Sequence, residues 1–359
     1  MNHEKPEISF IIPVYNGEKV ISRVIESVYR MPEKIRFEVI VIDDGSTDKT
    51  PEIVKKEMEL RSGLRMIRTS NSGQSRARNL GVEAAGGDYI FFADADDRIL
   101  AEGVDKLLLK AKENRLDVVS GTYLRIEKGK KPYQACSGLE NGSISRKESD
   151  LKRFHAFKTE SAFGYIWNKL FRKDFLLEHD IWFDDTIRVY MEDQLFNLKT
   201  IGESAKYYFL NVPVYEYFFE GLSTTRKPDA KIAEKSVDML KSYVSWLEKK
   251  NILEQNMDLL IPLAMRMACW AAFKNIRYEG ASYSKIKARL ILFSREKALR
   301  LLFETPDAKQ HLKELSSFFQ RRFFSLTFRL LKQKREGQLA FLFVIGSPLL
   351  TIAAGSMVR

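Results

Sequence analysis

VIVIDDGS at residues 39–46 and YIFFADADD at residues 89–97 are the two stretches that decide the fold. Each is a short apolar run that ends in a cluster of carboxylates. Runs without polar alternation are typical of parallel strands whose two faces are both covered by helices. Ligands of such sheets bind beyond the carboxyl ends of the strands. We therefore expect both acidic clusters at one crevice, where one can hold a metal ion and the other the polar edge of a nucleotide.

Apolar runs and amphipathic stretches alternate around these two segments, from Ile8 to about Tyr123. The strands expected from this pattern lie at 8–14, 37–43, 64–68, 89–93 and 117–123. The helices expected between them cover 20–28, a segment starting at Thr50-Pro51, 74–84 and 101–114. Because crossovers between parallel strands are right-handed, this order predicts an α/β fold, with a mostly parallel, Rossmann-like sheet flanked by helices.

The composition limits the number of domains and the kind of metal site that the chain can form. With 359 residues, 45% of them hydrophobic, the chain is long enough for one large domain or two smaller ones. The two cysteines, Cys136 and Cys269, match no metal or redox spacing and are expected to be reduced thiols. The four histidines are scattered as well, which disfavours zinc and favours a metal ion with oxygen ligands.

Six short motifs occur in the order found in family 2 glycosyltransferases, which the chain resembles over roughly Ile8 to Phe219. They are PVYN at 13–16, DDGSTD at 43–48, SRARNLG at 75–81, GDYI at 87–90, DADD at 94–97 and ED at 192–193. Each motif alone is weak, and their order and spacing carry the resemblance. It implies a GT-A fold and inverting transfer of a sugar from a nucleoside diphosphate donor.

The resemblance assigns a metal site to the second acidic cluster. Asp94 and Asp96 match the D-x-D pair of the family, with Asp96 as the direct ligand and Asp97 as a neighbour. A cation is useful there as a Lewis acid on the departing diphosphate, and hard oxygen ligands suit Mg²⁺ or Mn²⁺. Arg76 and Arg78 sit where a positive charge meets the diphosphate or braces Asp94, although Arg76 also fits a solvated helix face.

The first acidic cluster is assigned to the nucleotide. By position, Asp44 matches the family's acid that accepts a hydrogen bond from uracil, with Asp43 beside it, and this favours a UDP-sugar donor. Pro13 and Tyr15 fall on the loop that lies against the nucleoside. Taken alone, two acids before Gly45 favour a turn with an Asx cap, and the second cluster reverses that preference.

An inverting enzyme needs one base on the acceptor hydroxyl, and Asp193 matches the family's base at the start of a helix. Glu192 stands beside it, and the acceptor side is expected to include Trp167, Asn168 and Lys169 from the segment that precedes the base in many members. Alternatively, Glu192 and Asp193 only stabilise the N-terminus of a helix by their charge, and Trp167 only packs in the core.

Three regions are expected: a GT-A glycosyltransferase domain at 1–225, a helical extension at 226–306 and a membrane-associating tail at 307–359. Between Lys309 and Arg335 there are eight basic residues and one acid, Glu314, interspersed with phenylalanine and leucine. This composition is typical of a helix at the membrane interface. The alternative is a solvated basic face packed on the catalytic domain.

The end of the chain is almost wholly apolar from Leu339 to Ala354 but contains Gly346-Ser347-Pro348. A spanning helix needs about 20 apolar residues, so a re-entrant or in-plane segment is expected. We therefore place the protein in the cytoplasm, peripherally at the cytosolic face of the cell membrane, with an anionic membrane surface as a partner.

The sequence thus predicts a metal-dependent enzyme that adds one sugar to a lipid-linked or cell-surface glycan. Processive relatives carry Q-x-x-R-W, which QRRFF at 320–324 does not match. A nucleotidyltransferase that makes the activated sugar is an alternative. Such an enzyme needs a Gly-rich phosphate loop after the first strand, and PVYNG at 13–17 is not one. A nucleic-acid-binding protein would explain the net charge of +11, yet acidic strand ends repel phosphate without a metal, so no nucleic acid is expected.

Overall fold

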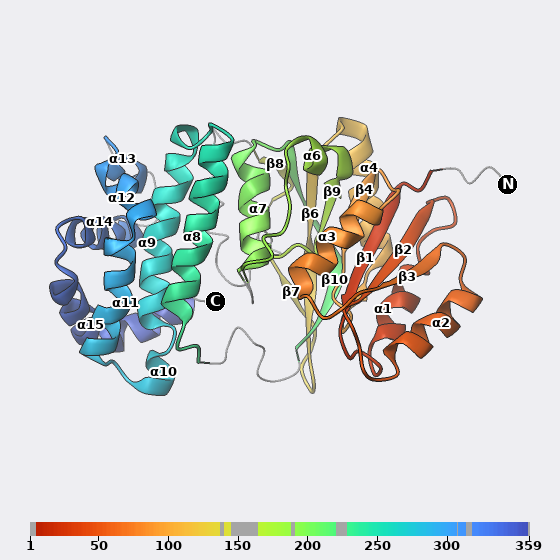
Figure 1. The fold of residues 1–359 in the computed structure, drawn as a ribbon, viewed down its shortest axis with the longest axis horizontal. Coiled ribbons are helices and arrows are strands. Elements are labelled where there is room, and N and C mark those ends of the chain that lie inside the picture. The colour runs from red at the N-terminus through yellow and green to blue at the C-terminus, as the bar shows by residue number, and fades with distance from the viewer. Residues whose placement is uncertain are drawn as a thin grey trace. The chain divides into compact units, whose positions relative to one another are not determined.

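The computed structural model describes residues 5–136, 140–144, 164–187, 191–219, 228–306, 308–313 and 318–357, and Figure 1 shows it as a ribbon. These residues form two compact units, which we call the α/β unit (5–144 and 164–219) and the helical unit (228–357). The expected domain boundary at 225 falls between them, outside the described residues. The tail expected as a third region belongs to the helical unit.

A ten-stranded sheet forms the centre of the α/β unit, in the order β3-β2-β1-β4-β9-β6-β10-β5, with β7 beside β6 and β8 beside β10. The strands are β1 (Ile8–Val14), β2 (Phe37–Asp43), β3 (Leu64–Arg68), β4 (Tyr89–Phe92), β5 (Arg98–Ile99), β6 (Val118–Glu127), β7 (Tyr133–Ala135), β8 (Gly142–Ile144), β9 (Lys169–Arg172) and β10 (Tyr207–Phe219). Strands β1 to β4 are mutually parallel, which confirms the expected fold class. Strand β9 runs antiparallel between β4 and β6 and makes the sheet mixed.

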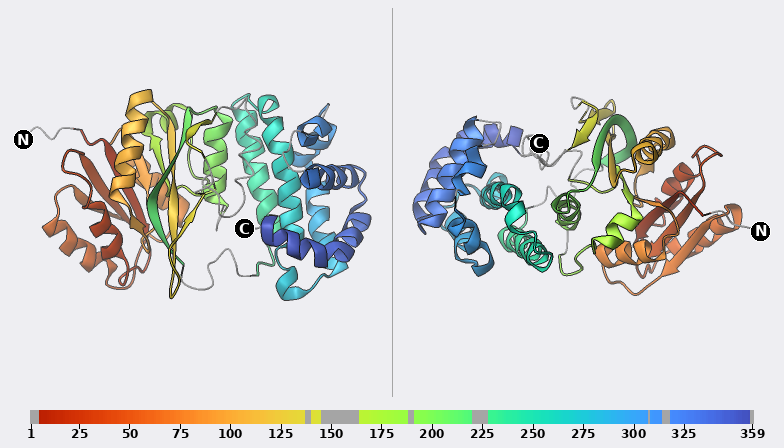
Figure 2. Two further views of the ribbon diagram at one scale, coloured as in Figure 1. Left: turned by 180° about the vertical axis from the view of Figure 1, so that it is seen from behind. Right: turned by 90° about the horizontal axis from the view of Figure 1, so that it is seen from above.

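Helices cover both faces of this sheet. They are α1 (Ile21–Val28), α2 (Thr50–Leu60), α3 (Gln74–Ala84), α4 (Ala101–Asn114), α6 (Lys173–Glu178) and α7 (Glu192–Gly202). Helix α3 lies in front of the sheet in Figure 1, whereas α4 lies in front of it in the reverse view of Figure 2. A Cβ on Gly81 of α3 would stand 2.3 Å from Cγ2 of Ile11, so this glycine lets α3 approach β1 closely. That approach places the side chains of α3 beside the strand ends.

The helical unit is built around α9, whose side chains are buried on nearly every side. Its helices are α8 (Ile232–Lys249), α9 (Met257–Phe273), α10 (Ile276–Glu279), α11 (Tyr283–Arg295), α12 (Lys297–Glu304), α13 (Ala308–Lys313), α14 (Phe318–Lys332) and α15 (Glu336–Met357), with a short 3-10 turn, η3, at Glu254–Asn256. Helices α8, α11, α13 and α14 all pack against α9.

Intramolecular packing takes up most of the apolar face of α14. Phe324, Leu330 and Leu331 are buried, and Phe328 packs against Phe303 at 5.4 Å between ring centroids. We expected these side chains to face a membrane, and they form part of the core instead, because α9 and α15 supply an apolar surface on which they pack. Within the described residues, no helix is both long and apolar enough to cross a membrane.

Candidate active site

The two acidic clusters lie at one edge of the sheet, as expected from the sequence. Strands β1 and β2 are in register from Ile8 opposite Phe37 to Val14 opposite Asp43. The backbone N–H of Asp44 donates to the carbonyl of Val14 at 2.8 Å, which continues the pairing past the strand ends. Ala93, which follows β4, likewise donates to the carbonyl of Ile11 at 3.0 Å. Both carboxylate clusters therefore flank the end of β1.

The first cluster is held rigidly by its surroundings. Asp43 is fully buried, pairs with Nε of Arg68 at 3.1 Å and accepts the N–H of Ser46 at 2.9 Å. Asp44 accepts the backbone N–H groups of Ser72 and Gly73, both at 2.8 Å. The bond from Ser46 to Asp43 is local, of the kind that the turn interpretation predicts, whereas the donors to Asp44 come from a loop 28 and 29 positions away. Because each carboxylate oxygen has two acceptor positions, they fix Asp44 and still leave capacity for a donor group of a ligand.

The loop after β1 presents one aromatic ring beside this cluster. Tyr15 is 52% exposed, whereas Pro13 is buried and supports the loop from below, so only the tyrosine is available to lie against a nucleoside. The next residue, Asn16, has a positive φ of 51° and ties the two loops together. Its N–H donates to Oγ of Ser46 at 2.9 Å, and its Oδ1 accepts the N–H of Thr47 at 2.8 Å.

Arg78 is the centre of the second half of the site. Its side chain is only 2% exposed and projects from α3. Nη1 donates to Oδ1 of Asp193 at 2.7 Å, and Nη2 donates to Oδ1 of Asp94 at 3.1 Å. Oε1 of Glu192 lies 3.8 Å from Nη1. Of the two roles expected for this arginine, bracing Asp94 is the one that the geometry favours, and the brace extends to the expected base.

Arg76, two residues earlier on α3, is exposed to solvent. The alternation of burial follows from helical geometry, since residues two positions apart point to different sides of a helix. Arg76 is therefore the arginine of this motif that remains accessible to a ligand.

The carboxyl of Asp193 has a strongly shifted acidity. Burial raises its pKa to about 7, the charges of Glu192 and Asp94 add to the rise, and the cations Arg78 and Lys169 oppose it. Burial raises the pKa of Glu192 as well. A carboxyl with a pKa near the operating pH is suited to take a proton from a hydroxyl. The side chain of Asp193 is 17% exposed and that of Glu192 is 8% exposed, so Asp193 is the more accessible of the two.

The D-x-D segment follows β4 and is anchored from below by Tyr215 of β10. The N–H of Asp94 donates to the hydroxyl of Tyr215 at 2.9 Å. Asp96 is exposed, and Asp97 is buried, where its Oδ1 accepts the N–H of Phe218 at 2.8 Å. Burial and the neighbouring charges of Asp96 and Asp94 raise the pKa of Asp97 well above its usual range. Three carboxyl groups thus lie close together in this segment, near enough for two of them to affect the acidity of the third.

Clustered carboxyl groups of this kind suit a divalent cation. Within the part of the chain that the structure describes, no three His, Cys, Asp or Glu side chains gather into a cage for a metal ion. Mg²⁺ is usually held by one or two carboxylates together with substrate phosphates and water. Asp94, whose side chain is 28% exposed, and the exposed Asp96 therefore suit an ion that arrives with a diphosphate.

The three residues expected on the acceptor side, Trp167, Asn168 and Lys169, are buried, which corrects the expectation that they contact the acceptor. Trp167 stacks on Tyr215 with ring centroids 4.5 Å apart. Nδ2 of Asn168 donates to the carbonyl of Gly121 at 2.8 Å. Burial lowers the pKa of the Lys169 ammonium to about 7. Lys169 begins β9, which lies inside the sheet between β4 and β6, and Trp167 and Asn168 directly precede it. These side chains therefore support the site from within the unit.

Tyr215 is the site residue that sequence reasoning missed. Its hydroxyl holds the D-x-D backbone, and its ring stacks on Trp167. Tyr215 and Asp94 are 121 positions apart, and no local pattern relates them. A spacing of two between Tyr215 and Tyr217 shows which tyrosines of the strand share a face, but it does not show what that face contacts.

Residues 9–179 match the model for glycosyl transferase family 2. These residues, a little under half of the chain, form a domain of that family. An uncharacterized glycosyltransferase of Bacillus subtilis, EpsJ, is 30% identical over 223 residues, which are 62% of this chain and 64% of that protein. The poly(ribitol-phosphate) beta-N-acetylglucosaminyltransferase TarS of Staphylococcus aureus is 28% identical over 59% of this chain and 35% of its own length. The match thus spans less than two thirds of either relative.

Solved structures of S. aureus TarS residues 1–349 share the fold of this chain. The complex with UDP superposes with a TM-score of 0.65 at 19% identity and covers 92% of each chain. The complex with UDP-GlcNAc gives the same TM-score, identity and coverage. The GT-A fold expected from the sequence is confirmed by this likeness.

Proposed function

We propose that this protein transfers one sugar from a UDP-sugar to a hydroxyl of a lipid-linked or cell-surface glycan, with inversion at the anomeric carbon. The observation that carries the proposal is the buried guanidinium of Arg78, which joins Asp94 of the D-x-D segment to Asp193 at the start of α7. Membership in the family supports transfer of a glycosyl group. The UDP and UDP-GlcNAc complexes of TarS support UDP as the carrier and make UDP-GlcNAc the first donor to test.

The donor end of the site consists of the exposed ring of Tyr15 and the fixed carboxylate of Asp44. The ring is placed for stacking on a base, and the carboxylate is placed to accept an N–H group such as that of uracil. Asp94 and Asp96 would hold Mg²⁺ or Mn²⁺ together with the diphosphate. When bound, such a cation stabilises the negative charge of the departing UDP.

The acceptor end is the carboxylate of Asp193. As the acceptor oxygen forms its bond to the anomeric carbon, its proton passes to Asp193, and the bond from that carbon to the UDP oxygen breaks. Arg78 keeps the carboxylate oriented through the 2.7 Å hydrogen bond to Oδ1, which leaves Oδ2 available to receive the proton. A base within hydrogen-bond reach contributes roughly 10² to 10⁴ in rate.

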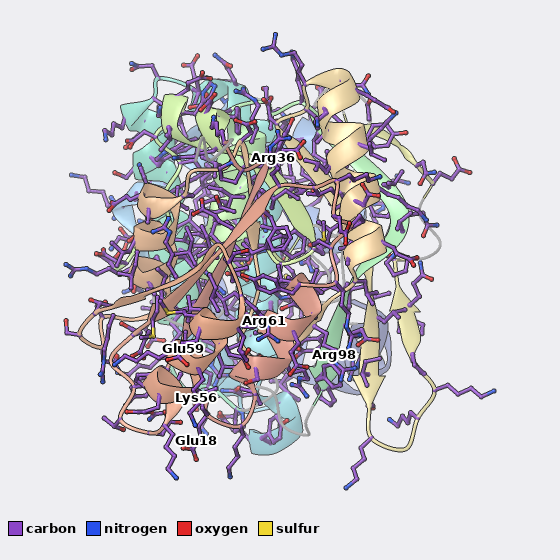
Figure 3. The ribbon with its side chains drawn as sticks, turned by 90° about the vertical axis from the view of Figure 1, so that its right-hand side faces the viewer. Glu18, Arg36, Lys56, Glu59, Arg61 and Arg98 are labelled. Carbon is purple, nitrogen blue, oxygen red and sulfur yellow. The ribbon has the colours of Figure 1, made fainter. Side chains whose placement is uncertain are left out.

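The two alternative functions lose support on separate grounds. Family membership favours transfer of the sugar over synthesis of the sugar nucleotide. The positive charge favoured a nucleic-acid-binding protein, but residues 1–227 contain 36 Lys and Arg against 36 Asp and Glu. One side of the molecule shows this mixture in Figure 3, where Glu18 and Glu59 occur among Arg36, Lys56, Arg61 and Arg98. A balanced surface does not favour a polyanion.

We also propose a peripheral position at the cytosolic face of the membrane. The whole net charge of the chain lies in residues 228–359, with 23 Lys and Arg against 12 Asp and Glu. A cationic region of this kind is attracted to the anionic cytosolic leaflet. An acceptor that is lipid-linked would be met there.

The proposed transfer is tested by nucleotide release from a panel of UDP-, GDP- and TDP-sugars, with and without Mn²⁺. We expect release from a UDP-sugar, dependence on Mn²⁺, loss in Asp96→Ala and strong reduction in Asp193→Asn. Asp185→Asn, an exposed residue of the same unit, is the matched control and should behave as the wild type. The proposal fails if the folded wild type releases nucleotide from no member of the panel, with or without glycan acceptors.

A further inference from the structure

Helix α15 has one face inside the protein and one face outside it. Its inner face consists of Glu336, Leu339, Ala340 and Phe343, which are all buried. Phe343 packs against Phe273 at 4.6 Å and Phe323 at 5.3 Å between ring centroids. Figure 1 shows α15 beside α11 and α14, the two helices that it contacts most. The position of the helix is therefore fixed by its inner face.

The outer face of the same helix is apolar although it is exposed. Phe341 is 57% exposed, Leu342 is 44% exposed and Ile345 is 62% exposed. Gln338, three residues before Phe341, is exposed on the same side of the helix. Arg335, seven residues before Leu342, is exposed there as well. Three large apolar side chains that are adjacent on one helix face form a patch, unlike single exposed leucines, which are common on soluble proteins.

Basic side chains adjoin the beginning of this patch. Lys332 is the last residue of α14, Lys334 and Arg335 lie in the turn before α15, and all three are exposed. Arg329, one helical turn before Lys332, is exposed too. The backbone N–H of Leu339 donates to the carbonyl of Arg335 at 3.2 Å, so Arg335 directly precedes the first turn of α15 and adjoins its outer face. The patch is thus an apolar stripe with a cationic end.

We propose that this face, Arg335, Phe341, Leu342 and Ile345 with Lys332 and Lys334, is the surface by which the protein docks on an anionic lipid bilayer. The inference rests on the membrane position proposed above and assigns the residues that produce it. Phe, Leu and Ile enter the boundary between headgroups and acyl chains, while Lys and Arg contact lipid phosphates, as in other interfacial helices. The sequence had assigned membrane attachment to the whole tail at 307–359, and the exposed face now assigns the docking to α15.

Charge decides between a bilayer and the two other occupants of such a face. A second copy of the chain would bring together two helical units that each have an excess of eleven positive charges over residues 228–359. A soluble polyanion would satisfy the basic residues but would leave the three apolar side chains in water. An anionic bilayer is complementary to both parts of the face.

The test is vesicle binding by the full chain without donor or acceptor, so a negative result here leaves the proposed sugar transfer untouched. Wild type is sedimented with vesicles of phosphatidylcholine alone and of phosphatidylcholine mixed with phosphatidylglycerol. We expect binding to the mixed vesicles, weakened by salt. Lys332→Gln, Lys334→Gln and Arg335→Gln together should reduce the affinity on the order of a hundredfold, at about 1 kcal/mol for each charge. Phe341→Ser, Leu342→Ser and Ile345→Ser together should reduce it by about tenfold or more.

Matched controls remove the same groups from the α/β unit. They are the exposed set Leu60→Ser, Leu109→Ser and Leu177→Ser, and the exposed set Lys19→Gln, Lys55→Gln and Lys56→Gln. Both control proteins should bind the mixed vesicles as the wild type does. Unchanged thermal melting of each variant by circular dichroism verifies that the comparison concerns the surface and not folding.

Three outcomes would overturn the inference. The first is no binding of the wild type to mixed vesicles at low salt. The second is equal loss in the control proteins. The third is normal vesicle binding by the apolar triple variant. If inorganic polyphosphate then displaces the vesicles, the face binds a polyanion. If the variant instead changes from dimer to monomer in sedimentation velocity, the face binds a second copy of the chain.

Discussion

Replacing Asp193 by asparagine should raise stability and strongly reduce activity at the same time. The folded-state pKa of Asp193 is raised to about 7 from an ordinary value of 3.8, mainly because the carboxyl is buried. Folding therefore takes an ionised carboxylate from water into a place that favours its neutral form. Asparagine has the same shape and no charge to bury. The variant thus removes an unfavourable term from folding and removes the base from the reaction.

The sign and size of the stability change follow from proton linkage. Below pH 3.8 the carboxyl of Asp193 is neutral in both states and contributes no difference. Between pH 3.8 and about 7 the unfolded chain loses the proton while the folded chain keeps it, so wild-type stability falls as pH rises. Above pH 7 the cost is constant and amounts to at most about 4 kcal/mol, at 1.36 kcal/mol for each pKa unit.

The assay is urea unfolding of wild type and Asp193→Asn from pH 4 to pH 8 in EDTA, so that no cation is bound. We expect the two free energies of unfolding to be similar near pH 4 and the variant to be the more stable protein at pH 8. Asp185→Asn, at an exposed position, should track the wild type. A variant that is less stable than the wild type at pH 8 would refute the reasoning, because it would mean that the pair with Arg78 stabilises the ionised carboxylate more than burial destabilises it.

Turnover supplies the second half of this test. With saturating donor and acceptor, wild-type kcat should rise about tenfold for each pH unit below the pKa of about 7 and level off above it. The variant should lose roughly 10² to 10⁴ in kcat and keep its affinity for UDP. A pH profile that is flat between pH 5 and pH 8 would exclude Asp193 as the group that limits turnover.

Three further outcomes are expected. Asp96→Ala should weaken UDP binding only in the presence of Mn²⁺, measured by calorimetry, and equal affinities of variant and wild type in saturating Mn²⁺ would exclude Asp96 from the metal site. Arg78→Met leaves three carboxylates without their shared cation, so it should destabilise the protein by roughly 3–5 kcal/mol in urea unfolding. Arg78→Lys should fold and transfer sugar slowly. Wild-type turnover in the lysine variant would show that the paired hydrogen bonds from Arg78 to Asp94 and Asp193 are dispensable. Gly81→Ala should cost about 1–3 kcal/mol, because its Cβ would stand 2.3 Å from Ile11, and the additional change Ile11→Ala should recover part of that loss if the clash is its cause.

Local signals were sufficient for the first half of the α/β unit. Strands β1, β2 and β3 begin and end at the residues expected, since each is an apolar run bounded by turn-forming or polar residues. The apolar face of α1 also lies where its helical spacing placed it, with Ile21, Val24, Ile25 and Val28 buried. Strand β9 was not anticipated, because four residues that lead directly into α6 contain too little periodicity to identify a strand.

For α14, the hydrophobic pattern of the sequence does not determine what its apolar face contacts. A basic helix with phenylalanine and leucine has the same sequence whether its apolar face meets lipid or protein. Phe328 and Leu331 are buried because other helices of the unit lie against them, while Phe341 and Ile345 on α15 are exposed because none does within the described residues. The choice between these outcomes depends on which helices pack together, and that is a property of the whole unit.

By itself, the sequence determined that two carboxylate clusters would follow two parallel strands and share one edge of the sheet. Strand direction and the position of an acid after an apolar run are local properties, and the parallel arrangement then brings the strand ends together. Only the tertiary structure decided that Arg78 and not Arg76 joins Asp94 to Asp193, at separations of 16 and 115 positions along the chain. The physical reason is that a buried charge takes its partners from whichever segments the packing brings within hydrogen-bond distance, and spacing along the chain does not encode that distance.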